Sequence, residues 1–216
     1  MVDSNPPEDP LKVLPDSLRL LAQRGDLRRF RKGHQLIQEG DRGDTMFIIL
    51  SGRVRAFGSG DKDREITYGT YGAGAYVGVI SLDGGPRSAS VEVIEACECA
   101  MVTRETLKQH IATHPEFAFE LIENLIGLAR AATLNAKQMA LNDVYGRLVL
   151  LLRSLAVAQV DGTAVVAERL THQEIANRLG CSREMVSRLM KDLEGGEYIG
   201  ASNGHLVLLR SLPARW

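Results

Sequence analysis

The stretch that decides the fold is LTHQEIANRLGCSREMVSRLMKDLEGGEYI, residues 170–199. Thr171 followed by Glu174 is a capping box, in which each side chain bonds a free backbone N–H at the start of a helix. Gly180 suits the left-handed turn that ends a helix, and Ser182 is a good cap for a second helix directly after it. The segment therefore predicts two short helices joined by a tight turn.

The second of these helices, residues 183–193, has one apolar and one polar side. The apolar positions follow helical spacing and are Val186, Leu189, Met190 and Leu193. The polar side carries Arg183, Glu184, Ser187, Arg188 and Lys191. In a helix-turn-helix the second helix enters the major groove of DNA, where arginine matches guanine O6 and N7 and glutamate accepts from cytosine N4. We therefore predict a DNA-reading unit. The alternative is a solvated helix surface with an ion pair between Glu184 and Arg188.

Net charge alone does not indicate nucleic acid. The 216-residue chain carries a formal charge of -1, with 44% hydrophobic and 25% charged residues, the balance of an ordinary globular protein. From residue 168 to the end there are seven Lys/Arg and six Asp/Glu, a balance of +1. Any affinity for DNA must therefore come from the placement of a few cations rather than from a generally basic domain.

The N-terminal half of the chain has a different pattern of apolar and turn residues. Residues 1–14 are polar and proline-rich, which is typical of a loose leader, and Leu14 to Gln23 has helical spacing. From about Leu27 to Val102, short apolar runs such as residues 46–50 alternate with frequent glycines. Regular turn residues between short apolar runs indicate an all-β sandwich or roll.

A long helix is predicted from about Glu116 to Asn142, after a break at Pro115. Apolar and small residues recur along it with spacings of three and four, which is a heptad repeat. The repeat consists of Ala118, Leu121, Leu125, Leu128, Ala132, Asn135 and Met139. Packing against the chain's own domain is one reading of this repeat. We favour pairing of the helix with a second subunit, with Asn135 fixing the register.

The segment from residue 141 to about residue 157 continues as helix, and two turn signals follow it. Asp161-Gly162 lies between two apolar runs, and Ser202-Asn203-Gly204 precedes a predicted strand from His205 to Leu209. Both patterns are typical of β-hairpins. The C-terminal part is therefore expected to mix helices with small hairpins.

Cysteine and histidine usage argues against a metal centre and leaves a redox role of Cys97 and Cys99 open. Cys97 and Cys99 form a C-x-C pair with no second pair to complete a metal site, and alternate positions of a strand share one face. We interpret both as small strand residues. The five histidines, which are His34, His110, His114, His172 and His205, show no ligand pattern, and we expect each at the surface.

The chain has no apolar run of about 18 residues and no signal peptide pattern, so we expect a cytoplasmic protein without a membrane segment. It also has no phosphate-binding loop, nucleophile elbow or HExxH motif. We therefore expect no enzymatic activity and no catalytic residue.

At the residues quoted above, the chain closely resembles the Crp/Fnr family of bacterial regulators, and the resemblance covers nearly the whole chain. Gly33-x6-Gly40 and residues 46–54 are similar to that family's cyclic-nucleotide-binding β-roll, and residues 142–148 to its hinge. The resemblance implies base reading by Arg183, Glu184 and Arg188 on a TGTGA-like half-site. It implies phosphate contacts by Thr171, Gln173, Ser182 and Lys191.

The family's ligand cassette matches residues 78–89 here. The resemblance implies an effector pocket formed by Gly78, Val79, Arg87, Ser88, Ala89, Ala132 and Thr133. Arg87 can clamp a phosphate; the alternative is an exposed arginine on a turn. Cyclic-AMP binders of the family carry a glutamate where Val79 stands, and a threonine and serine where Ala132 and Thr133 stand. These departures disfavour cyclic AMP, and leave a cyclic dinucleotide or no ligand open. No iron-sulfur cluster or haem is expected.

Together these features predict an α+β protein with three parts: an effector-sensing β-roll with its leader (1–115), a dimerisation helix (116–142) and a winged helix-turn-helix domain (143–216). The predicted function is transcription regulation by a homodimer on palindromic double-stranded DNA, with RNA polymerase as partner. The alternatives are a ligand-independent regulator, or a nucleotide-responsive signalling module that acts through a protein partner.

Overall fold

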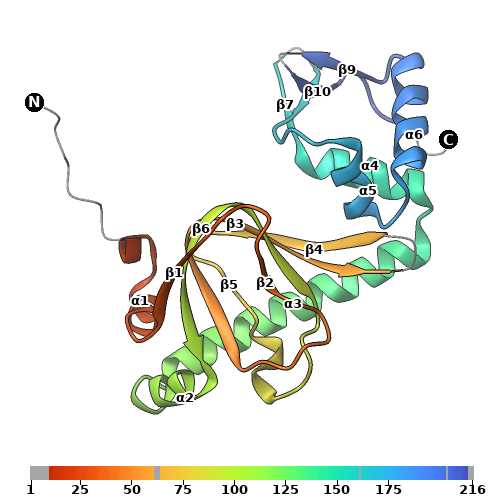
Figure 1. The fold of residues 1–216 in the computed structure, drawn as a ribbon. Coiled ribbons are helices and arrows are strands. Elements are labelled where there is room, and N and C mark those ends of the chain that lie inside the picture. The colour runs from red at the N-terminus through yellow and green to blue at the C-terminus, as the bar shows by residue number, and fades with distance from the viewer. Residues whose placement is uncertain (1–9, 61–63, 161, 203, 214–216) are drawn as a thin grey trace, which may run out of the picture. The chain divides into compact units, whose positions relative to one another are not determined.

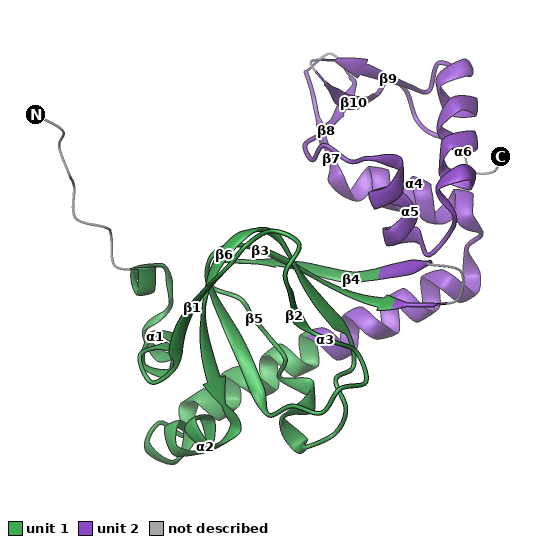
Figure 2. Ribbon diagram, in the orientation of Figure 1, with its two compact units in different colours: residues 1–58, 67–127 green, residues 59–66, 128–216 purple. Residues whose placement is uncertain are grey.

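The computed structural model describes residues 10–60, 64–160, 162–202 and 204–213. The chain forms two compact units, one from residues 1–58 and 67–127 and the other from residues 59–66 and 128–216 (Figure 2). The predicted leader falls mostly outside the described residues. Of the described helices, none is long and apolar enough to cross a membrane.

The first unit is built around an antiparallel sheet, as the glycine-punctuated sequence predicts (Figure 1). The short helices η1 (Pro10–Val13) and α1 (Asp16–Ala22) precede it. The strands are β1 (Asp26–Phe30), β2 (Gln35–Ile37), β3 (Thr45–Ser59), β4 (Glu65–Gly72), β5 (Tyr76–Val77) and β6 (Ser90–Thr103). Their order is β1-β6-β3-β4, with β2 paired to β6 and β5 paired to β3. The short helix η3 (Ile80–Asp83) lies between β5 and β6.

The inner face of this sheet is apolar because long strands alternate inward and outward side chains. Its cluster includes Ile49, Val54 and Val93, each fully buried. Cys97 and Cys99 lie on the same face of β6, as predicted, with their sulfur atoms 3.6 Å apart. Burial raises the pKa of both thiols. Thiols held protonated in this way are poor nucleophiles and poor metal ligands.

Two helices follow the sheet. Helix α2 spans Arg104–Thr113, and α3 spans Glu116–Leu141, with the predicted break at Pro115 between them. One prediction is wrong here. His110 on α2 was expected at the surface, but its side chain is completely buried, because it packs against residues of the next helix that no local pattern reveals.

The second unit contains the C-terminal part of α3 and a compact domain. Its elements are α4 (Val144–Leu155), β7 (Ala156–Ala158), β8 (Ala164–Val166), α5 (His172–Leu179), α6 (Arg183–Gly195), β9 (Ile199–Ser202) and β10 (His205–Leu208). The strands form an antiparallel sheet in the order β7-β8-β10-β9. The strands of both predicted hairpins are paired, β7 with β8 and β9 with β10, while the turn residues Asp161 and Asn203 lie outside the described residues. The helix predicted from residue 141 to about residue 157 is interrupted at Asn142 and Asp143, and it ends at Leu155, directly before β7.

One apolar cluster holds the three helices of this domain together. Leu148 and Leu152 from α4, Ile175 from α5, and Val186 and Leu193 from α6 are all essentially inaccessible to solvent. Each such side chain contributes on the order of 1.5–3 kcal/mol when it leaves water. The apolar positions predicted for α6 are all buried, so the opposite side of that helix is left facing outward.

Candidate nucleic-acid interface and effector site

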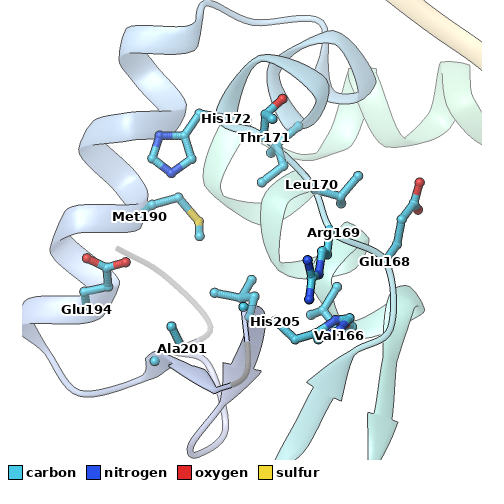
Figure 3. A pocket seen from close by; sticks show the side chains of 14 residues that line it. Val166, Glu168, Arg169, Leu170, Thr171, His172, Met190, Glu194, Ala201 and His205 are labelled. Atoms are coloured by element: carbon cyan, nitrogen blue, oxygen red, sulfur yellow. The ribbon is translucent and has the colours of Figure 1, made fainter. Parts of the chain in front are cut away.

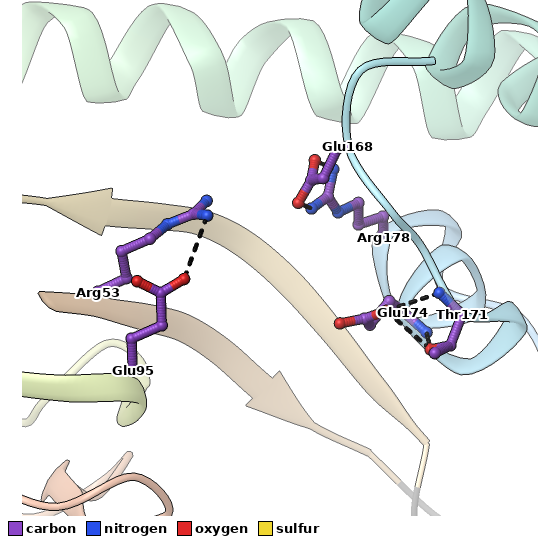
Figure 4. A network of polar contacts seen from close by, with 6 residues as sticks. All are labelled: Arg53, Glu95, Glu168, Thr171, Glu174 and Arg178. Atoms are coloured by element: carbon purple, nitrogen blue, oxygen red, sulfur yellow. Dashed lines mark hydrogen bonds and ion pairs between the residues drawn. The ribbon is translucent and has the colours of Figure 1, made fainter. Parts of the chain in front are cut away.

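The start of α5 is fixed by the predicted capping box, which Figure 4 shows. Thr171 Oγ1 accepts from the backbone N–H of Glu174 at 3.2 Å. The Glu174 carboxylate in turn accepts from the Thr171 backbone N–H at 2.7 Å and from its hydroxyl at 2.8 Å. Figure 4 also shows Arg178 bound to Glu168 through two hydrogen bonds of 2.9 and 2.6 Å. These contacts hold α5 at both ends.

The same figure shows an ion pair of another kind. Arg53 on β3 and Glu95 on β6 are register partners in the sheet, with nitrogen and oxygen 3.6 Å apart. Both side chains are largely exposed, and exposed pairs of this kind contribute little stability. The two-pronged pair of Arg178 and Glu168 is shorter and less exposed, so it is the more effective constraint.

The turn between the helices follows the sequence prediction. Gly180 adopts a φ of +63°, a backbone conformation that strains other residues. Ser182 then caps α6 by accepting from the backbone N–H of Met185 at 3.3 Å. Because the turn is short and both caps are formed, the orientation of α6 on α5 is fixed by local backbone geometry as well as by the apolar cluster.

Arg147 makes hydrogen bonds to the ends of two helices that are distant in the sequence. Its guanidinium donates to the Asn142 carbonyl at 2.9 Å and to the Leu179 carbonyl at 3.2 Å. These carbonyls lie at the C-terminal ends of α3 and α5. The last carbonyls of a helix have no hydrogen-bond partner within the helix, and the helix dipole has its negative end there. One cation therefore joins the end of the long helix to the end of the first helix of the helix-turn-helix.

The outward side of α6 presents the residues predicted to read bases. Arg183, Glu184 and Arg188 are all exposed. Within the described part of the chain, none of the three makes a side-chain hydrogen bond or ion pair. In particular, Glu184 and Arg188 are not paired with each other, so the alternative of an intrahelical ion pair is not what the structure shows. These side chains are free to meet an external partner.

The four residues predicted to hold phosphates are in different situations. Lys191 is exposed on α6. Gln173 donates to Asn177 within α5 at 2.8 Å. The hydroxyls of Thr171 and Ser182 are used in the two helix caps. All four lie on or beside α5 and α6, but only Lys191 has a side chain without an internal partner in the described residues.

A polar contact between the two helices was missed by sequence reasoning. His172 Nδ1 and Ser187 Oγ are 2.9 Å apart and join α5 to α6. Ser187 was placed on the outward side of α6, yet it is half-buried. The two residues are fifteen positions apart on different helices, so no periodic pattern could have paired them.

A cleft of about 320 Å³ lies between the two helices and the hairpin β9–β10 (Figure 3). Val166, Ile175 and Met190 are buried apolar residues that line it. Arg169, Thr171, His172, Glu194 and His205 are among its polar lining residues. The cleft adjoins Thr171, one of the predicted phosphate contacts.

In the first unit, the predicted effector cassette is centred on Arg87. The alternative of an exposed arginine is excluded, because Arg87 is only 7% exposed. Its guanidinium donates to the Gly78 carbonyl at 3.0 Å, to Ser81 Oγ at 2.7 Å and to Thr45 Oγ1 at 3.1 Å. Burial lowers the pKa of Arg87, and the Asp44 carboxylate opposes that shift. The cation is thus already held by protein oxygens.

Glycines make room for this arginine. A Cβ on Gly43 would lie 2.7 Å from Arg87 Nη2, and one on Gly78 would lie 3.0 Å from Nη1. Gly78 also has a φ of +89°, which disfavours any other residue. Gly43 and Thr45 were not part of the predicted site, and Ser81 lies in the predicted cassette but was not named as a contact, because their approach to Arg87 depends on the folding of the sheet.

The remaining predicted effector residues differ in exposure. Val79 is buried and Ala89 half-buried, whereas Ser88 is exposed. Ala132 and Thr133 are exposed on α3, and the Thr133 hydroxyl donates to the Ala129 carbonyl of its own helix at 2.9 Å. These two belong to the second compact unit. No group of three or more potential metal-ligating side chains occurs among the described residues.

A β-roll with a buried arginine, a long helix and a capped helix-turn-helix define a class of protein: DNA-binding regulators with a sensory domain. Family models agree with this class. Residues 27–114 match the cyclic nucleotide-binding domain, and residues 169–195 match the bacterial regulatory proteins of the crp family.

Individual relatives lead to the same family. The chain is 31% identical over 184 residues to a CRP-like cAMP-activated global transcriptional regulator of Mycobacterium tuberculosis, covering 83% of this chain and 82% of the relative. It is 29% identical over 193 residues to the CRP-like protein Clp of Xanthomonas oryzae, covering 84% and 83%. The solved structure of the c-di-GMP responsive global regulator CLP of Xanthomonas campestris superposes with a TM-score of 0.78 at 26% identity, covering 89% and 97%.

The chain belongs to the Crp/Fnr family of bacterial transcription regulators. Its α+β fold, its cyclic-nucleotide-binding domain and its DNA-binding helix-turn-helix are those of that family.

The capping box generates a stability prediction. Thr171→Ala removes the oxygen that accepts from the Glu174 N–H, and should lower the free energy of unfolding by about 0.5–2 kcal/mol. Thr171→Ser keeps the oxygen and serves as the matched control, with an expected change of a few tenths at most. Urea unfolding followed by circular dichroism measures both. Equal losses in the two variants would show that the cap contributes nothing.

Proposed function

We propose that the protein is a homodimeric regulator that reads a palindromic TGTGA-like site through α6. The observation that carries this proposal is the state of Arg183, Glu184 and Arg188. They are exposed on one side of a helix whose start and orientation are fixed, and none is engaged by another described side chain. Fixed, unpaired charges at the start of such a helix are what base recognition requires, because their hydrogen bonds form without first breaking internal ones.

The chemistry of the half-site follows from these side chains. Arginine forms a two-pronged contact with guanine O6 and N7, while glutamate accepts from cytosine N4. Lys191 is available for a backbone phosphate, and the Ser182 hydroxyl hydrogen is unused by the cap. Gln173 and Thr171 would have to exchange an internal hydrogen bond for a phosphate contact. We propose all four as phosphate contacts, with Lys191 giving the largest gain.

Pairing along α3 supplies the second half-site. The predicted heptad repeat is only partly available, because Ala118, Leu121 and Leu128 are half-buried in their own chain. A second repeat lies one residue further on and is more exposed. It consists of Phe119, Ile122, Ile126, Ala129, Thr133, Ala136 and Ala140.

The larger members of this second repeat carry apolar surface that a monomer leaves in water. Phe119 is 71% exposed, Ile122 50% and Ile126 44%. Its last members are small, which permits close approach of two helices. We propose that a second copy of α3 covers the side of the helix between the two repeats. The α6 helices of the two subunits then reach major grooves roughly 34–36 Å apart.

Other parts of the proposal rest on family membership. Binding to RNA polymerase and a cytoplasmic location are expected of a bacterial regulator of this family. The alternative, a nucleotide-responsive signalling module acting through a protein partner, gives no reason for the arrangement of Arg183, Glu184 and Arg188. We therefore favour direct action on DNA.

The effector is proposed to be a phosphate-bearing nucleotide other than cyclic AMP. Two of the relatives named above differ in this respect, the Mycobacterium tuberculosis regulator being cAMP-activated and the Xanthomonas campestris regulator c-di-GMP responsive. Here Val79 offers no carboxylate for a ribose hydroxyl, and Ala132 offers no hydroxyl for a base. Each lost hydrogen bond weakens binding by on the order of 1–3 kcal/mol. A cyclic dinucleotide or ligand-independent action is consistent with these losses.

Operator binding tests the central claim. The protein should bind a TGTGA-N6-TCACA duplex more tightly than a scrambled duplex in a gel-shift titration. Arg188→Ala should cost about 1–3 kcal/mol per half-site and relax specificity at one base pair of each half-site, because it removes one base contact from each subunit. Lys191→Ala should weaken binding to both duplexes alike and lower the salt slope by about two, because it removes one phosphate contact from each subunit of the proposed dimer.

The two variants are controls for each other in this experiment. Equal affinity for operator and scrambled DNA in the unsubstituted protein would refute the proposed site. Unchanged specificity in Arg188→Ala would refute the base-reading role of that residue.

Effector choice is tested in the same assay. We expect operator affinity to stay within about threefold when cyclic AMP or cyclic GMP is added at micromolar concentration, because the two missing partners weaken binding roughly a hundredfold. Cyclic di-GMP and a ligand-free sample complete the series and separate a cyclic dinucleotide effector from ligand-independent binding. A strong response to micromolar cyclic AMP would contradict the argument from Val79 and Ala132.

Pairing along α3 is tested by sedimentation equilibrium. Ile126→Glu places a charge in the proposed interface twice per dimer, and should raise the dimer dissociation constant by about 100-fold or more. Leu134→Glu makes the same kind of change on the opposite side of the helix, where Leu134 is 54% exposed, and is the matched control, with little expected change. If the two variants dimerise equally well, the proposed interface is wrong.

A further inference from the structure

The least explained polar group in the first unit is the imidazole of His110. Its side chain is completely buried on α2, and neither ring nitrogen has a hydrogen-bond partner among the residues the structure describes. Buried polar side chains almost always have such a partner. An exception of this kind calls for a physical explanation.

The surroundings of the ring are defined by two other rings. His110 stacks on His114 with centroids 4.6 Å apart and an angle of 15°. It also meets Phe117 edge to face, at 5.1 Å and 82°. Phe117 is itself fully buried and is the second residue of α3. The His110 ring therefore packs the end of α2 against the first turn of α3.

The charged groups around the ring act in opposing directions. Burial lowers the pKa of His110, and so do His114 and Arg24, whereas Glu116 and Glu120 raise it. Glu120 already accepts a hydrogen bond from the Ser17 hydroxyl at 2.8 Å. The net result is a lowered pKa. A protonated ring would carry two N–H donors into a place where no described oxygen accepts from them.

We propose that His110 makes the contact between α2 and the first turn of α3 labile to acid. The neutral ring fits the closed packing, and the protonated ring is accommodated only when α2 moves away from Phe117. This is a two-state element with a proton as its ligand, because the two packings differ in their affinity for the proton. Its consequence for DNA binding rests on the proposed function, since α3 is the proposed pairing helix.

The direction of the pH effect follows from linkage. The unfolded chain takes up the proton at the ordinary histidine pKa of about 6.5, whereas the folded chain takes it up only at lower pH. The contribution of His110 to stability is therefore intact above pH 6.5. This contribution is lost as the pH falls from 6.5 towards the lowered pKa of His110 in the folded state. The unfolding equilibrium constant rises by about tenfold for each pH unit by which the folded pKa lies below the unfolded pKa.

Chemical unfolding of the full chain between pH 7.5 and pH 5.0 tests the proposal. His110→Phe keeps a ring for both stacking partners but removes the titration, so its unfolding constant should change less with pH than that of the unsubstituted protein. His34→Phe is the matched control, because His34 also stacks on a ring, that of Phe30 at 5.0 Å, but is exposed. This control should keep the pH dependence of the unsubstituted protein.

A nuclear magnetic resonance titration of the unsubstituted protein does not depend on any variant folding. The chemical shift of the His110 ring carbon should titrate with a midpoint below pH 6.5 in the folded state. A midpoint at or above pH 6.5, or an unchanged pH dependence of unfolding in His110→Phe, would overturn the proposal. Failure of operator binding at pH 7.5 would instead count against the proposed function, so the two failures are distinguishable.

Discussion

The apolar side of α6 has to be buried, and the rest of the recognition surface depends on this constraint. Val186 and Leu193 are buried against α4 and α5, and their burial fixes the rotation of α6 about its own axis. Once that rotation is fixed, the positions left facing outward are Arg183, Glu184 and Arg188. The caps and Gly180 set the angle of the helix, but the apolar cluster decides which side chains it presents.

The protein uses arginine in three ways that differ in physical terms. Arg188 is exposed and has no side-chain partner among the described residues, so all its N–H groups can donate to an external partner. Arg147 joins the carbonyl ends of two helices and acts only on the geometry of the unit. Arg87 is buried among three protein oxygens, so any phosphate that binds it must replace or share contacts that are already made. The affinity of an effector for Arg87 therefore depends on how much stronger its contacts are than the protein contacts that they replace.

Features that depend on neighbouring residues could be predicted from the sequence. The capping box of Thr171 and Glu174, the turn at Gly180, the break at Pro115 and the hairpins all rest on contacts within a few positions, and each is present. Features that depend on distant residues could not. The acceptors of Arg87 come from positions up to 42 residues away, His172 meets Ser187 across two helices, and the burial of His110 depends on the first turn of α3. The cleft beside the β9–β10 hairpin is likewise assembled only when five elements come together.

The long helix has a consequence for how the protein folds. The boundary between the two compact units falls within α3, between Gly127 and Leu128. Backbone hydrogen bonds of an α-helix link each residue to one four positions earlier, so the ladder of α3 runs across that boundary without interruption. Unravelling one half would leave up to four N–H or C=O groups of the other half without partners. The two units are thus joined by a shared cooperative element, and melting of one destabilises the other even where no side chains connect them.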